Sequence, residues 1–139
     1  IRRLTPEVVL GHDPWKRYRL HPDHRHAGFL TVDGVVAARD PHFFPEQSFA
    51  HHRPGALLLF EADEPDHVEA VGEAEAERKL AALESHNSQL VSTMFVDASS
   101  PDHERQRDAF RSRVRDDLAE QGALAGVPMG EAFKAITEL

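Results

Sequence analysis

The chain has 139 residues and no cysteine, so it can form a single hydrophobic core but neither disulfides nor thiolate metal sites. Its formal charge of −8 argues against a nucleic-acid partner, because binding to phosphates needs a basic face. No apolar run approaches the length of a membrane span and the first residues show no signal peptide, so we expect a cytoplasmic protein without a membrane span.

Short apolar runs alternate with longer segments of helical periodicity along the chain. Such alternation is typical of an α/β fold with a mainly parallel sheet. The runs at 8–10 and 56–60 are apolar without alternating polar residues, so we expect both strands to be buried in the complete molecule. In chain order, the pattern predicts the end of a helix at 1–4, a strand at 8–10, a helix at 22–39, strands at 56–60 and 66–71, helices at 73–86 and 101–121, and a strand at 131–136.

The most informative motif lies between the first strand and the first long helix, where three histidines and an aspartate occupy 21–26. Pro22 suits the first helical position, and Asp23 then lies in the first turn, where a negative charge is favourable. His24 follows His21 by three residues and lies on nearly the same side of the helix, whereas His26 points away. The motif therefore places two imidazoles and a carboxylate beyond the end of a strand, where open α/β sheets bind ligands.

This motif resembles the second metal motif of the LmbE-like, or PIG-L, deacetylase family, which includes the N-acetylglucosaminyl-phosphatidylinositol de-N-acetylases. Further segments resemble the family in the same order. They are 37–46, 57–60 with 64–68, the helix that carries Lys79 and Ala82 and continues to His86, Ser88 and Gln89, and the last strand at 131–133. The resemblance implies a Rossmann-like, mainly parallel sheet with flanking helices.

One departure from the family is as informative as the agreements. The family opens with a strand that ends in His-Pro-Asp-Asp-Glu, which this chain lacks, because its only His-Pro-Asp begins at His21 and is followed by His24. The chain also begins at Ile1 rather than at a methionine. We therefore expect 1–139 to be the C-terminal portion of one LmbE-like domain, with an incomplete sheet and an exposed apolar edge that the N-terminal part of the same protein covers.

The resemblance implies a role for each residue of the motif. His24 would be a ligand of zinc or a similar divalent metal, His21 would stabilise the oxyanion, and Asp23 would orient a histidine. Tyr18 and Arg19 would line the substrate entrance. Each role has a structural alternative: a capping or surface histidine, compensation of the helix dipole, or a solvated loop residue.

Other acidic residues and histidines receive no family role. His12 and Asp13 follow the first strand, but nothing in the resemblance makes either a ligand, so we expect this chain to supply a single metal ligand. The acidic run at 61–66 lacks the spacing of a calcium loop.

The resemblance implies a zinc-dependent hydrolase that removes an acyl group, typically acetyl, from the nitrogen of a small N-acyl amino sugar. Without cysteine, the metal would take imidazole and carboxylate ligands, which suits zinc. The alternative is a non-catalytic binding or structural remnant of the same fold. The exact substrate and a homo-oligomeric state are left open by the sequence.

Overall fold

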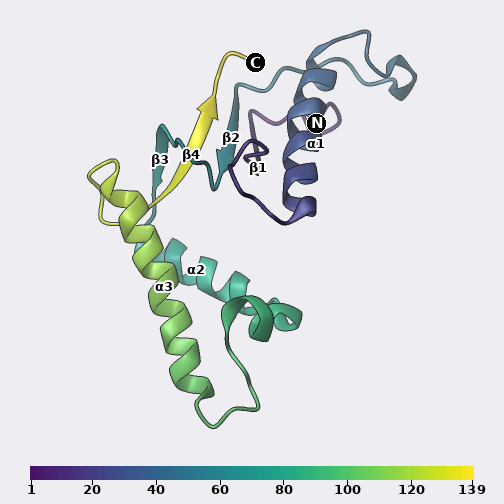
Figure 1. The fold of residues 1–139 in the computed structure, drawn as a ribbon. Helices are drawn as coiled ribbons and strands as arrows, with labels where there is room; N and C mark the ends of the chain where they lie inside the picture. Colours follow the sequence, from purple (N-terminus) through teal and green to yellow (C-terminus); the bar gives the residue numbers. More distant parts are fainter. The chain divides into compact units, whose positions relative to one another are not determined.

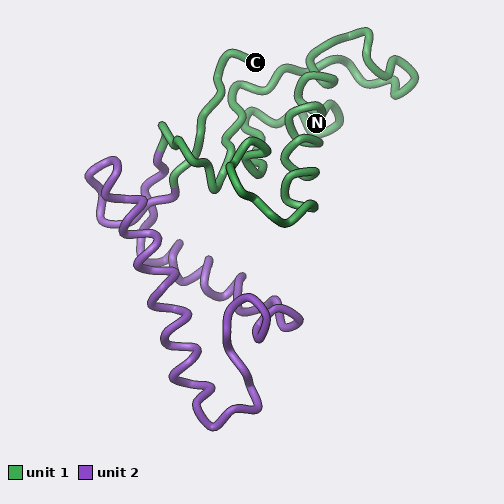
Figure 2. The backbone as a smooth tube through the Cα atoms, in the orientation of Figure 1, with its two compact units in different colours: residues 1–67, 132–139 green, residues 68–131 purple.

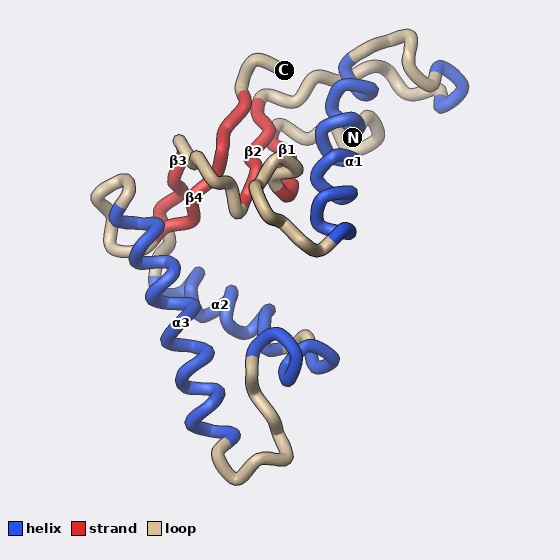
Figure 3. The backbone as a smooth tube through the Cα atoms, in the orientation of Figure 1, coloured by secondary structure: helices blue, strands red, loops and turns tan.

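The computed structural model describes residues 1–139, which form two compact units, 1–67 with 132–139 and 68–131 (Figure 2). The chain contains both strands and helices (Figures 1 and 3). They are β1 (Val8–His12), α1 (Pro22–Arg39), β2 (Ala56–Phe60), β3 (His67–Ala70), α2 (Glu73–Glu84), α3 (His103–Ala123) and β4 (Gly130–Ile136). The predicted α/β class is confirmed. None of the helices is both long and apolar enough to cross a bilayer.

The sheet has four strands in the order β1-β2-β4-β3. Strands β1 and β2 run parallel, with Val9 opposite Leu57. Strand β4 runs antiparallel to β2, with Phe133 opposite Phe60. The parallel pair is the part that positions the candidate site, because the carboxyl ends of β1 and β2 reach the same edge of the sheet.

Helix α1 packs on one face of β1 and β2. The shared core contains Val35 from the helix and Leu57 and Leu59 from β2, all buried. Gly28 of α1 lies where the helix passes close to the end of β1, since a Cβ atom there would lie 2.7 Å from the carbonyl oxygen of His12. A glycine in a helix interior costs some stability, and this close approach explains why one stands here.

Strand β1 and residues 1–4 are the segments of this unit where the structure and the sequence prediction have to be compared. Val8 and Leu10 are 45% and 58% exposed in this chain, whereas burial of the first strand was predicted for the complete molecule and stays a prediction. Strand β1 is at the edge of the sheet and α1 covers only one of its faces, which leaves alternate side chains outside the core. Residues 1–4 form a turn rather than a helix end, and the backbone N–H groups of Leu4 and Thr5 both donate to the carbonyl of Ile1.

In the second unit, α2 packs against α3. Leu80 of α2 is fully buried against Phe110 and Val114, and Leu118 is buried on the same face of α3, as the four-residue spacing predicts. Ion pairs join the two helices along their exposed side. They link Glu73 to Arg115, Glu77 to Arg111 and Arg115, and Glu84 to Arg107 and Arg111.

Candidate active site

Helix α1 begins at Pro22, and His21 is its N-terminal cap. The backbone N–H of Asp23 donates to Nδ1 of His21 at 3.3 Å, and the Asp23 carboxylate lies 4.0 Å from the same nitrogen. Because Nδ1 accepts a hydrogen bond, the neutral ring carries its proton on Nε2. The cap therefore fixes His21 as a hydrogen-bond donor on its outer nitrogen.

Three imidazole rings stack where the end of β1 meets the start of α1. The ring centroid of His24 lies 4.5 Å from that of His12 and 4.8 Å from that of His21, with interplanar angles of 11° and 21°. His12 is the last residue of β1, and its ring also packs against Phe60 at the end of β2. The helix start thus brings both histidines of the motif to the edge of the sheet.

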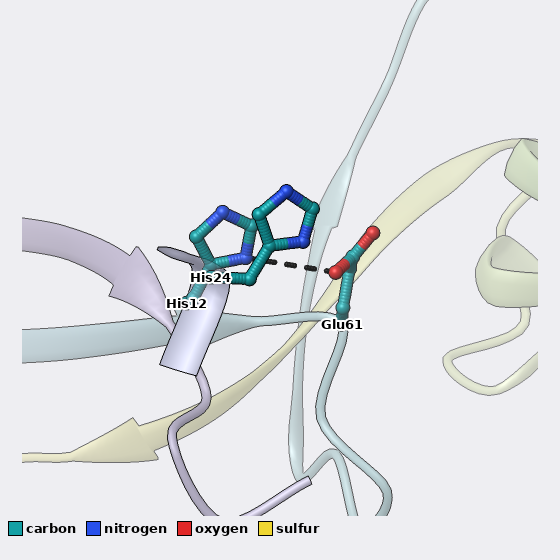
Figure 4. A group of neighbouring side chains, drawn as sticks. All are labelled: His12, His24 and Glu61. Atoms are coloured by element: carbon teal, nitrogen blue, oxygen red, sulfur yellow. Dashed lines mark ion pairs between the residues drawn. The ribbon is translucent and has the colours of Figure 1, made fainter. Parts of the chain in front are cut away.

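His12, His24 and Glu61 each place one potential ligand atom within 4.8 Å of the others. Figure 4 shows the two imidazoles side by side with the Glu61 carboxylate opposite them, and Nδ1 of His12 lies 3.6 Å from Oε2 of Glu61. Glu61 directly follows β2 and has a left-handed φ of 56°, so the chain turns immediately after the strand. Two imidazoles and one carboxylate form a donor set found in hydrolytic zinc sites, so these residues fit such a metal.

Arg19 lies between the three potential ligands. Its Nη1 is 2.7 Å from Oε2 of Glu61, 2.8 Å from Nδ1 of His12 and 3.5 Å from Nδ1 of His24. The side chain is only 5% exposed, and its Nε is buried without a hydrogen-bond partner. A cation bound by all three ligands would therefore compete with the Arg19 guanidinium for the same atoms.

The charges of this cluster follow from its partial burial and from Arg19. Burial lowers the pKa of His12, and the nearby charges of His24 and Arg19 add to the effect, which Glu61 opposes. Burial disfavours the charged form of Glu61, but the hydrogen bond and the charge of Arg19 outweigh it, so the pKa of Glu61 is lowered. At neutral pH the cluster thus presents a neutral imidazole and an ionised carboxylate, the states that bind metals.

The other predicted site residues border the same space. A cavity of about 220 Å³ is lined by His21, His24, Tyr18, Arg19 and Glu61, together with Lys16, Arg17 and Leu20. Tyr18 has a left-handed φ of 58° and is almost fully exposed at the cavity mouth. Asp23 does not line the cavity but contacts His21, and His26 is exposed and lies outside the cluster.

Sequence reasoning missed His12 and Glu61 as neighbours of His24. The expectation of a single metal ligand in this chain stays a prediction, and the structure adds His12 and Glu61 as two further candidates. A signal for them was available, because each follows a predicted strand and the carboxyl ends of parallel strands share one edge of a sheet. The sequence did not indicate, however, that these two strands are neighbours.

A search for similar proteins found a relative with a known activity. The chain is 37% identical over 93 residues to the diacetylchitobiose deacetylase of Thermococcus kodakarensis. The aligned residues make up 65% of this chain and 34% of the relative. No family model matches the chain. The chain thus spans about a third of the length of this relative.

Solved structures of similar fold include proteins from three organisms. The N,N'-diacetylchitobiose deacetylase of Pyrococcus horikoshii, solved with an inhibitor, has a TM-score of 0.74 and 26% identity over 98% of this chain and 48% of its own. A conserved protein of Thermus thermophilus has a TM-score of 0.62 at 23% identity, covering 99% of this chain and 55% of its own. The 4-carboxy-2-hydroxymuconate hydratase of Pseudomonas putida has a TM-score of 0.61 at 18% identity, covering 97% and 54%. The similarity to the last two proteins shows a similar fold and nothing more.

Proposed function

The chain belongs to the LmbE-like, or PIG-L, family, and from this premise we propose that the complete protein is a metal-dependent hydrolase that removes the acetyl group from an N-acetylated amino sugar. One observation carries the proposal: His21 and His24 line one cavity, and His12 and Glu61 complete a metal-binding donor set beside them. The deacetylase activity of the Thermococcus and Pyrococcus relatives supports the same chemistry.

The metal is proposed to be zinc, held by His24 with His12 and Glu61 as further candidate ligands. A bound zinc ion supplies an activated water molecule and polarises the amide carbonyl. Glu61 would contribute a negative charge that offsets part of the charge of the ion. His12 would contribute Nδ1, the atom that now accepts a hydrogen bond from Arg19.

His21 is proposed to stabilise the oxyanion that develops as water attacks the amide. Its Nε2 carries the proton of the neutral ring, because Nδ1 accepts from the backbone of Asp23. It can therefore donate a hydrogen bond without first becoming protonated. Asp23 is proposed as a positioning residue, because its backbone N–H donates to Nδ1 of His21. A donor fixed in advance stabilises the transition state because it needs no reorganisation during the reaction.

Tyr18 and Arg19 are proposed to contact the substrate at the mouth of the cavity. Lys16 and Arg17 line the same cavity and make its rim basic. A basic rim of this kind suits a sugar that carries an anionic substituent, and it also accepts a neutral sugar.

A second candidate function is a non-catalytic binding module that keeps the fold. The specific observation in its favour is Arg19, whose guanidinium already compensates Glu61 and contacts both histidines of the cluster. A fold shared with a hydratase also means that the fold does not determine the chemistry.

The test is a measurement of bound metal and of acetate release on the complete protein, with N-acetylated amino sugars as substrates. The variants are His24→Ala and, as a matched control on the same helix, His26→Ala. We expect His24→Ala to lose the metal and the activity, whereas His26→Ala keeps both, because only His24 belongs to the cluster. Equal metal loss in the two variants would contradict the assignment, and a wild-type protein without metal and without acetate release would favour the binding module.

A further inference from the structure

A cavity of about 480 Å³ lies between the exposed face of α1 and the loop that follows this helix. Leu30, Asp33 and Ala37 recur at helical spacing and form its helix side. Phe43 and Phe44 form its loop side, and the loop extends away from the sheet (Figure 1). None of the residues that line this cavity also lines the one with His21 and His24, so the two cavities are separate.

The loop side of the cavity is held in place by Arg2. This side chain is buried, and its guanidinium donates to the carbonyl groups of Ala37 and Asp40 at 2.7 and 2.6 Å, where α1 ends. The same guanidinium donates to the carbonyl of Phe44 at 3.4 Å. Arg2 thus ties the loop to the end of the helix, and the wall that carries Phe44 has a defined position.

Phe44 has an unusual backbone for a bulky residue, with a left-handed φ of 49°. This conformation is costly for a side chain with a Cβ atom, and such strain is concentrated at functional sites. The ring does not join a buried core that would offset the cost, because Phe44 is 51% exposed and its neighbour Phe43 is 47% exposed. The two ring centroids lie 6.2 Å apart at an interplanar angle of 47°. The cavity therefore has two aromatic rings, fixed at an angle to each other, on one side.

Asp33 is the only charged residue that lines the cavity. It is exposed, and its carboxylate has neither an ion-pair partner nor a hydrogen-bond partner in the chain. Aromatic faces beside a free carboxylate attract an organic cation through the ring quadrupoles and the opposite charge. An anion would be repelled by Asp33, and the net charge of −8 also favours the approach of cations.

We propose that this cavity binds an organic ammonium cation with an apolar body, of the arylalkylamine type. The ammonium group would lie between the carboxylate of Asp33 and the faces of Phe43 and Phe44, and the apolar body would pack on Leu30 and Ala37. The volume lies within the range of small-molecule sites. The site is independent of the proposed deacetylase function, because none of its residues belongs to the candidate metal cluster.

The experiment titrates the complete protein with three probes that share a phenyl ring and differ in charge: 2-phenylethylammonium, 2-phenylethanol and 3-phenylpropanoate. Dissociation constants come from the shifts of the backbone amide resonances of 30–37. The variants are Asp33→Asn and Phe44→Leu. The control is Glu46→Gln, which makes the same change of charge at an exposed position of the same loop outside the cavity.

We expect the ammonium probe to bind most tightly to the wild type and the carboxylate probe least. Asp33→Asn should weaken the ammonium probe by about two- to fivefold and leave 2-phenylethanol unchanged, because only the ion pair is lost. Phe44→Leu should weaken the ammonium probe by about the same factor, because a leucine side chain has no ring quadrupole. Glu46→Gln should bind all three probes like the wild type.

Three results would overturn the proposal. The first is equal affinity for all three probes, and the second is an equal loss in Asp33→Asn and Glu46→Gln, which would show attraction by net charge alone. The third is the absence of shifts in 30–37 with every probe, which would show that another part of the complete protein fills the cavity. If Phe44→Leu does not fold, which circular dichroism shows, Phe43→Leu takes its place, and unchanged ammonium binding in that variant overturns the proposal.

Discussion

At the scale of single residues, Arg19 is the residue whose contacts compete most directly with a bound metal ion. Its guanidinium contacts all three potential ligands and leaves Nε buried without a partner, an arrangement that is costly in isolation. A metal ion would draw Glu61 and the imidazoles away from it. Arg19 would then be free to turn toward the cavity that it already lines.

Replacing Arg19 should therefore strengthen metal binding. In Arg19→Met the ion no longer displaces hydrogen bonds to a charged group, which are worth about 1.5–3 kcal/mol each, so we expect zinc affinity to rise by roughly ten- to a hundredfold. Competition with a chelator at fixed pH measures this, and Arg3→Met, an exposed arginine outside the cluster, is the control. A weaker affinity in Arg19→Met than in the control would mean that Arg19 organises the ligands instead of competing with the metal.

His21 tests the division between chemistry and metal binding. It lines the cavity but is not part of the ligand cluster, so His21→Ala should keep the metal. The loss of one oxyanion donor should lower kcat by about 10²–10³, and kcat/KM should fall in parallel because the interaction forms mainly in the transition state. Steady-state kinetics with parallel metal analysis measure both. Loss of the metal in His21→Ala would show that His21 is a ligand, and full turnover would reduce it to a helix cap.

At the scale of secondary-structure elements, prediction succeeded where a local signal marks an element. Pro22 marks the start of α1 and the apolar run at 56–60 marks β2, and both match the structure. The exposure of Leu10 in this chain could not be predicted, because a strand's own residues do not show whether a neighbour covers its second face. The same holds for His12 and Glu61, whose proximity depends on the pairing of β1 with β2.

The ion pairs between α2 and α3 predict a specific response to acid. Hydrogen bonds from Arg107 and Arg111 lower the pKa of Glu84 from 4.5 to about 2, despite an opposing effect of burial. Its contribution to stability is thus complete above pH 4.5 and is lost as the pH falls toward 2. We expect Glu84→Gln to lower the free energy of unfolding at pH 7 by about 1–3 kcal/mol and to differ little from the wild type near pH 2.

Urea unfolding at several pH values tests this prediction. The control is Asp102→Asn, which removes an exposed partner of Arg105 at the N-terminal cap of α3 and should stay close to the wild type at every pH. A difference between Glu84→Gln and the wild type that is equally large at pH 7 and at pH 2 would show that Glu84 acts through packing rather than through its charge.

At the scale of the whole molecule, the order of the elements was predictable but the direction of β4 and the division into two units were not. Periodicity shows that 131–136 is a strand, yet only its partner β2 makes it antiparallel. The division follows from two separate cores, one around Val35 and Leu57 and one around Leu80 and Phe110. Hydrophobic residues in a sequence do not show which of them share a core.

The two cores predict that damage in one unit spares the function of the other. Every residue of the candidate metal cluster and of the cavity lined by His21 and His24 lies in the unit 1–67 with 132–139. Leu80→Ala removes a fully buried side chain from the other unit, which should cost about 2–5 kcal/mol there. Val35→Ala opens the packing between α1, which carries His24, and β2, at a cost of about 1–3 kcal/mol.

We therefore expect Leu80→Ala to raise hydrogen exchange in α2 and α3 while zinc affinity stays near that of the wild type. Val35→Ala should have the opposite effect, with faster exchange in α1 and weaker zinc binding, because His24 is held in place by that helix. Hydrogen exchange can measure the two effects separately, because different parts of a protein open with different free energies. If Leu80→Ala lost zinc as readily as Val35→Ala, the two units would unfold as one cooperative body, and the site would depend on the packing of the whole chain.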